Sequence, residues 1–224
     1  MTNWKAWSGW FGIAFVVLEL AVGGLYFSFG TPVNAADTAA FAKFVAANTQ
    51  GELAVMVLTG LAVGCAYVWI LGLQGALKEK PDWGWAGDFT FIVGAIAATL
   101  GLLGAGLQTA AVIDASAKAE PVAVRALFEA GAVIIAPVSA VPTALFVGAA
   151  SYGIRGSGAL WKWTGTLGYI AAVLVLLTLF TPYFGQDPTN ALSIVGLGTF
   201  SVGILPTFVW AAATSVALIR SKPA

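Results

Sequence analysis

Histidine is absent from this 224-residue sequence, and Cys65 is its single cysteine. Their scarcity excludes the usual zinc, haem, copper and iron–sulfur ligand sets, disulfide bonds, and catalysis that depends on histidine. We therefore predict neither a metal nor a cofactor, and the alternative is a hard cation held by carboxylates and carbonyls. Cys65 lies inside an apolar stretch, where a thiol resists ionisation, so we interpret it as an inert apolar residue.

Charged residues are also few. They make up 9% of the chain, against roughly 25% in an average soluble domain. Ten basic and ten acidic residues cancel, so no positive field exists that would attract nucleic acid, and we expect no nucleic-acid partner. The hydrophobic fraction of 59% instead predicts a protein surrounded by membrane lipid.

Long apolar runs divide the chain into six segments, each long enough to cross a bilayer as a helix, which takes about 20 residues. The loops between them are short. The sequence therefore predicts an all-α membrane protein in which residues 1–224 form a single domain of six transmembrane helices. The predicted helices cover approximately residues 7–29, 53–77, 89–113, 127–152, 160–184 and 191–219.

The loop between the first two segments carries a helical pattern of its own. Within residues 37–48, the apolar residues Ala40, Phe41, Phe44 and Val45 recur at helical spacing. We predict a short amphipathic helix that lies on the external membrane surface.

Prolines interrupt two segments. Pro137 and Pro142 lie in the fourth segment, and Pro206 lies in the sixth. A proline inside a helix removes a backbone hydrogen bond and clashes with the preceding turn, so both segments are predicted to be kinked. In lipid the freed carbonyls need donors, and we therefore expect these segments to border a cavity.

Small residues share helix faces at several positions. Gly60 and Gly64 lie one turn apart in the second segment, and Gly94 and Ala98 do so in the third. Because small residues let backbones approach closely, we predict that both pairs serve packing between helices.

Basic residues are distributed unevenly over the loops. Most of them fall on the side that carries both termini, which predicts cytoplasmic N- and C-termini. Tryptophans gather at the same boundary, as an aromatic belt does. The basic residues are Lys5, Lys78, Lys80, Arg155, Lys162, Arg220 and Lys222 on that side, and Lys43, Lys118 and Arg125 on the other.

The general layout resembles a known kind of protein. An Ala/Gly-rich core, the turn Gly153–Trp163 and the closing stretch Thr214–Arg220 are similar to those of uncharacterised small multi-pass inner-membrane proteins of GC-rich bacteria. The resemblance covers most of the chain and concerns composition and spacing. It implies a location in the bacterial plasma membrane and brings no catalytic residue with it.

Glu19 lies near the middle of the first segment. A carboxylate at that depth costs on the order of 3 kcal/mol, so we expect the side chain to face the bundle interior and to have a partner on another helix. Gly23 and Tyr26 share its helix face. Two hypotheses remain open, namely a group that handles protons and a neutral carboxyl that only links helices.

Other polar residues lie toward the outer ends of the third and fourth segments. Gln108 and Asp114 belong to the third segment, and Glu129 follows Arg125 by four residues in the fourth. That spacing favours an ion pair at the interface, since residues four apart are neighbours on a helix. The alternative is that Glu129 turns inward and meets Gln108.

Three functions fit these features. The first is binding or transport of an apolar or amphiphilic small molecule in a cavity of the bundle, linked to protons through Glu19. The second is an intramembrane isomerase or acid-initiated cyclase with a lipid-soluble substrate such as an isoprenoid. The third is a subunit of a homo-oligomer or of a larger membrane complex. The candidate acids and bases are Glu19, Glu129 and Asp114, and the candidate ligand-binding residues are Phe15, Tyr26, Gln108, Pro137, Ser139 and Pro206.

Overall fold

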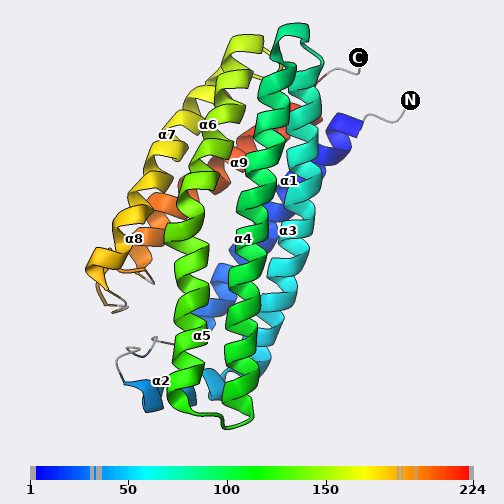
Figure 1. The fold of residues 1–224 in the computed structure, drawn as a ribbon. Helices are drawn as coiled ribbons and strands as arrows, with labels where there is room; N and C mark the ends of the chain where they lie inside the picture. The colour runs from blue at the N-terminus through cyan, green and yellow to red at the C-terminus, as the bar shows by residue number, and fades with distance from the viewer. Residues whose placement is uncertain are drawn as a thin grey trace.

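In the computed structural model, several long helices run side by side, and the first and last helices of the chain cross behind them at an angle (Figure 1). It describes residues 4–30, 33, 37–185, 187, 189–194 and 196–221. Within these residues, six helical spans are long and apolar enough to cross a membrane, which confirms the predicted fold class. The spans contain α1 (Trp4–Ser28), α3 (Thr49–Lys78), α4 (Gly84–Ser116), α5 and α6 (Pro121–Val133 and Ser139–Ser157), α7 (Lys162–Leu177), and α8 and α9 (Leu197–Thr199 and Leu205–Ile219).

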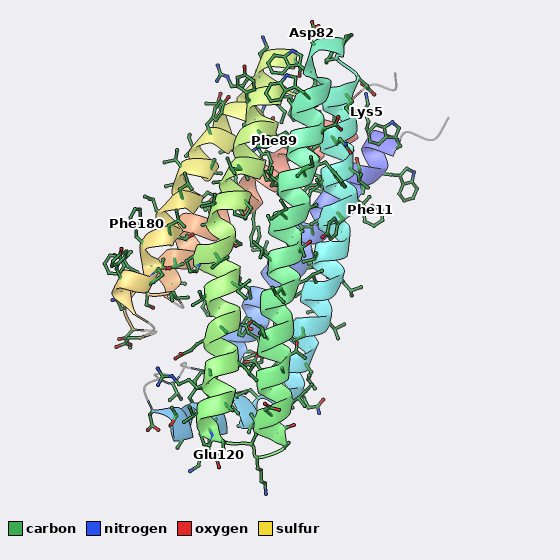
Figure 2. The ribbon with its side chains drawn as sticks, in the orientation of Figure 1. Lys5, Phe11, Asp82, Phe89, Glu120 and Phe180 are labelled. Atoms are coloured by element: carbon green, nitrogen blue, oxygen red, sulfur yellow. The ribbon has the colours of Figure 1, made fainter. Side chains whose placement is uncertain are left out.

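The six spans form a ring. α1 packs between α3 and α9, α4 packs between α3 and α6, and α7 packs between α6 and α9. The first turn of α1 and the last turn of α9 lie at the same end of the bundle (Figure 1), here called the Trp4 end. Figure 2 shows Lys5 and Asp82 near this end and Glu120 at the opposite one, here called the α2 end.

Aromatic and charged side chains surround the Trp4 end. Nζ of Lys5 lies 2.5 Å from a carboxyl oxygen of Glu79, and Nζ of Lys78 lies 2.8 Å from Asp88. Amphipathic indole rings prefer the boundary between lipid and water, so this end fits one membrane surface. The exposed tryptophans there are Trp4, Trp7, Trp10, Trp85, Trp161 and Trp163.

α2 (Thr38–Ala47) is the short helix predicted between the first two spans. Asp37 caps its first turn by accepting a hydrogen bond of 3.0 Å from a backbone N–H, as N-cap residues do. The apolar face expected to lie on lipid instead packs on protein, because Phe41 and Val45 are buried against α4 and α5. In Figure 1, α2 covers the ends of the long helices, which project beyond the α7–α9 hairpin.

π-helical turns interrupt the two spans in which kinks were predicted. One covers Ile134–Val138 and contains Pro137, and the other covers Phe200–Ile204, just before Pro206. A proline offers no N–H to an α-helical bond, and the wider π turn lets the chain continue past it. Such turns occur frequently at functional sites.

The sixth span begins at Leu197, whereas the prediction started it at residue 191. The chain before it forms turns. Asn190 accepts a 3.1 Å hydrogen bond from the backbone N–H two residues later, and Thr199 donates one of 2.6 Å to the carbonyl of Ser193. Short polar side chains compete with helical bonding in this way, which explains the late start.

Glycines allow one close contact between helices and leave another face open. A Cβ on Gly131 of α5 would lie 2.5 Å from the carbonyl oxygen of Gly104 in α4. A Cβ on Gly60 or Gly64 of α3 would meet no atom within 4 Å. The prediction that Gly60 and Gly64 pack between helices of the bundle is therefore wrong, because both glycines face outward. Gly94 does pack closely, against the ring of Phe146.

Candidate functional site

A cavity of about 240 Å³ lies inside the ring of helices. All six spans contribute side chains to its wall, and each π-helical turn borders it, one through Ile135 and the other through Gly203. Pockets for drug-sized ligands measure roughly 300–1,000 Å³, so this cavity suits a smaller molecule.

Glu19 of α1 lines this cavity and is half-buried. In the part of the chain that the structure describes, its carboxyl group makes no hydrogen bond and no ion pair, and the expected partner on another helix is not found. Neighbours on the same helix face, Gly12 and Val16, are buried against the bundle. The carboxyl group is therefore held inside the protein and left free for a ligand or a proton.

Aromatic rings form the wall on the side of Glu19 that faces the Trp4 end. Phe15 stacks on Trp69, with ring centroids 6.0 Å apart, and meets Phe208 edge-on at 5.7 Å. Trp69 in turn meets Phe146 edge-on at 5.6 Å. All four rings line the cavity. Their mutual packing fixes the rings, so the wall is rigid and apolar here.

Hydroxyl groups supply most of the remaining polarity of the wall. A hydroxyl has one proton to donate, and a hydroxyl that has donated it keeps its lone pairs as acceptors. Thr143 makes no hydrogen bond among the described residues. The other four donate to backbone carbonyls: Ser139 to Ile135, Thr178 to Val175, Thr199 to Ser193 and Thr207 to Gly203.

Tyr26 lies outside the cavity wall and pairs with an acid that the sequence analysis missed. Its hydroxyl lies beside the carboxyl group of Glu52, in the first turn of α3. Glu52 is 1% exposed, and its Oε2 has no partner among the described residues. Tyr26 also lies close enough to Glu19 for their charges to interact. The prediction began the second helix at residue 53, and so placed Glu52 in a loop.

The other predicted acids lie toward the α2 end and do not line the cavity. Nε of Arg125 lies 2.5 Å from an oxygen of Glu129, which is the ion pair that the spacing favoured. Asp114 is half-buried near the end of α4. Gln108 is buried and packs against Gly131 of α5. None of these residues meets Glu19 across the cavity.

The predicted prolines lie next to residues of the cavity wall but are not part of the wall themselves. Pro137 and Pro206 are absent from the lining residues, while Ala136 and Thr207 beside them line the cavity. Of the predicted ligand-binding residues, Phe15 and Ser139 lie on the wall.

Several wall residues were missed although the sequence contains a pattern for them. Thr199, Gly203 and Thr207 recur at every fourth position, which places them on one helix face. Trp69 lies inside a span, nine residues before its end at Lys78, and is buried, unlike the exposed tryptophans of the Trp4 end.

Comparisons of the chain with protein-family models, with curated proteins and with solved structures find no match. Its function is therefore inferred from the residues of the cavity.

Proposed function

We propose that this protein binds or transports an apolar or amphiphilic small molecule in the central cavity, and that Glu19 exchanges a proton as the ligand binds or leaves. The observation that carries the proposal is an unpaired carboxyl group on the wall of a cavity bordered by two π-helical turns. Ionisable groups inside membrane spans mark ligand or proton pathways, because an idle one would only destabilise the fold.

The composition of the wall supports a ligand site. Apolar and aromatic side chains dominate it, and a few hydroxyls and one carboxyl group supply the polar contacts. Binding pockets for small molecules have this combination, in which apolar area gives affinity and a few polar groups fix orientation.

The enzyme hypothesis receives less support. An acid-initiated isomerisation or cyclisation needs one group to give a proton and another to take one. Glu129 is engaged with Arg125, and neither Glu129 nor Asp114 lines the cavity. Within the described residues, Glu19 is the single carboxyl group on the wall.

The proposal includes an orientation. The Trp4 end, with the first turn of α1 and the last turn of α9, faces the cytoplasm in this proposal, which the excess of basic residues on that side supports. The resemblance in layout favours the bacterial plasma membrane as the location. A lipophilic ligand would then reach the cavity through or across that membrane.

Native mass spectrometry of the protein extracted with its lipids tests the proposal. We expect one small molecule to co-purify with the wild type. Gly101 lines the cavity, and a Cβ there would meet no atom within 4 Å, so Gly101→Leu should fill the cavity and exclude that molecule. Gly60→Leu is the matched control, since Gly60 is equally open but lies outside the wall. Equal retention by both variants would place the ligand elsewhere and remove the proposal.

A further inference from the structure

The polar groups on the cavity wall are almost all hydrogen-bond acceptors. Glu19 has two carboxyl oxygens, and four hydroxyls have given their protons to backbone carbonyls. Within the described residues, Thr143 has the one side-chain hydroxyl on the wall that is free to donate. Nε1 of Trp69 is buried, and the adjacent Cδ1 lies against Gly12 of α1, so its N–H does not face the cavity.

Among the residues that the structure describes, no lysine or arginine lies on the wall. Basic residues of the described chain are instead used at the two ends of the bundle, where Lys5, Lys78 and Arg125 pair with carboxylates. An ionised Glu19 therefore has no counter-charge inside the protein. The missing partner must come from a ligand or from a proton.

The aromatic part of the wall favours the same kind of ligand. The π face of an aromatic ring is negative and attracts cations, with Trp giving the strongest effect. Phe15, Trp69, Phe146 and Phe208 line the cavity next to Glu19. Carboxyl oxygens and hydroxyl lone pairs thus give the cavity its negative potential, and the four rings beside them give it an apolar surface.

We infer that the ligand of this cavity is a hydrophobic cation, that is, a quaternary or protonated amine on a small apolar body. Its ammonium group lies beside Glu19, and its apolar body lies among the four rings. The inference rests on the proposed function and specifies its ligand class. A neutral molecule would leave the carboxylate unpaired, and an anion would meet only acceptors. The cation and a proton are alternatives at Glu19, because either one neutralises it.

A pair of probes with nearly the same shape and different charge tests this inference. Benzyltrimethylammonium carries a fixed positive charge, and neopentylbenzene is its neutral isostere. Binding is measured by equilibrium dialysis of the protein in lipid nanodiscs, with protein-free nanodiscs as the correction for partitioning into lipid. The wild type should bind the cation about tenfold or more tightly than the isostere.

Substitutions of Glu19 separate charge from shape. Glu19→Gln should lower the preference to about one, because the amide fills the same space without a charge. Glu19→Asp should retain the preference for the cation. This result would show that the loss of preference in Glu19→Gln comes from the missing charge and not from misfolding. Gly101→Leu should reduce binding of both probes, and Gly60→Leu should leave both unchanged.

The pH dependence of cation binding provides an independent test. Neither probe changes its charge with pH, so any change in affinity must come from the protein. Affinity for benzyltrimethylammonium should rise with pH, by up to about tenfold per pH unit, because the cation binds the ionised form of Glu19. Tyr26, which lies beside Glu52, is the titratable side chain whose charge interacts with Glu19, and within the described residues the other spans bring no titratable group to the wall. Affinity in Glu19→Gln should not change with pH.

Each outcome is decisive. Equal binding of the two probes, abolished by Gly101→Leu, would overturn the cation class while leaving the proposed ligand cavity intact. A cation preference that survives in Glu19→Gln would also overturn it. If neither probe binds the wild type above the nanodisc background, the inference is wrong, and the native mass spectrometry result decides separately whether the cavity binds another ligand.

Discussion

At the scale of single residues, the main feature is a carboxyl group that is expected to contribute little to the stability of the folded protein. Glu19 lies in a membrane span, lines a cavity and has no partner among the described residues. A polar group kept in such a setting lowers stability, because its desolvation is not repaid by a hydrogen bond. Under the proposed function, Glu19 is retained because it binds a ligand or a proton, as other functional sites trade stability for activity.

The first prediction concerns the stability of Glu19 variants. Glu19→Leu should leave the melting temperature in detergent unchanged or raise it, because an unpaired carboxyl group is replaced by an apolar side chain of similar size. The same variant should lose cation binding. Thermal unfolding followed by the near-ultraviolet signal of the tryptophans measures the first effect. A clear drop in melting temperature would show that Glu19 has a structural partner, and would favour the packing role.

The second prediction concerns the pair formed by Tyr26 and Glu52. Tyr26→Phe removes the hydroxyl and leaves a buried carboxyl group without a partner, which should destabilise the protein by about 1–3 kcal/mol. Tyr67→Phe is the control, because the hydroxyl of Tyr67 pairs with Thr99 on the exposed side of the bundle and should contribute less. Equilibrium unfolding in mixed micelles measures both.

A double-mutant cycle distinguishes the pair from a general effect of the substitution. Glu52→Leu and Tyr26→Phe together should show a coupling free energy of about 0.5–3 kcal/mol, as groups in one hydrogen-bonded unit do, because each substitution removes one partner. Additive effects of the two substitutions would mean that the pair does not exist in the folded protein.

At the scale of helices, packing depends on which face each helix turns toward its neighbours. Gly104 and Gly131 bring α4 and α5 into backbone contact, whereas Gly60 and Gly64 form an open face on α3. These sites look alike in sequence, since each is a glycine in an apolar span. Their different surroundings allow a direct comparison.

The third prediction uses that comparison. Gly131→Ala should destabilise the protein by about 1–3 kcal/mol, because the new Cβ would lie 2.5 Å from the carbonyl oxygen of Gly104, and backbone atoms cannot move aside easily. Gly60→Ala should be neutral or slightly stabilising, since Ala favours helix and nothing lies within 4 Å. Unfolding free energies in the same detergent measure both variants.

The same variants test the hypothesis of a partner subunit. Helices that pack on a Gly-x-x-x-Gly face lose contact when the glycines are enlarged. If Gly60→Ala lowers stability in native membranes but not in detergent, where a partner would be removed, α3 has a partner there. Equal behaviour in both settings would favour a face covered by lipid.

At the scale of the whole molecule, the two ends of the ring of six spans carry different side chains. The Trp4 end carries the aromatic belt and the ion pairs of Lys5 and Lys78, and the α2 end carries the short helix with its own apolar cluster. The two ends thus differ in composition, and the distribution of basic residues predicts which of them faces the cytoplasm.

The fourth prediction is the orientation itself. Single cysteines at Ser116 and Lys80, in a Cys65→Ser background, lie at opposite ends of the bundle, where both native residues are exposed. A membrane-impermeant thiol reagent added to intact cells should label only the cysteine at position 116. Labelling of position 80 alone would reverse the orientation, and Cys65→Ser without an added cysteine gives the background.

The sequence by itself determined the number of spans, their approximate limits and the short helix between the first two. Backbone groups in lipid must bond within their own helix, so a long apolar run has only one structure available to it. The interruptions of α-helical bonding at Pro137 and before Pro206 also followed from local chemistry, because a proline lacks the N–H that a helix requires, whereas Pro142 lies within α6. Where polar side chains offered competing bonds, as before Leu197, the predicted limit was off by several residues.

Only the tertiary structure decided which face of each helix meets which neighbour. These spans are apolar all round, so the periodicity that distinguishes buried from exposed faces in a soluble protein is weak here. The rotation of each helix therefore could not be derived from sequence. That rotation gathers Glu19 and the aromatic rings around one cavity, pairs Tyr26 with Glu52, and turns Gly60 outward. The candidate site exists because packing among six helices fixes these rotations together.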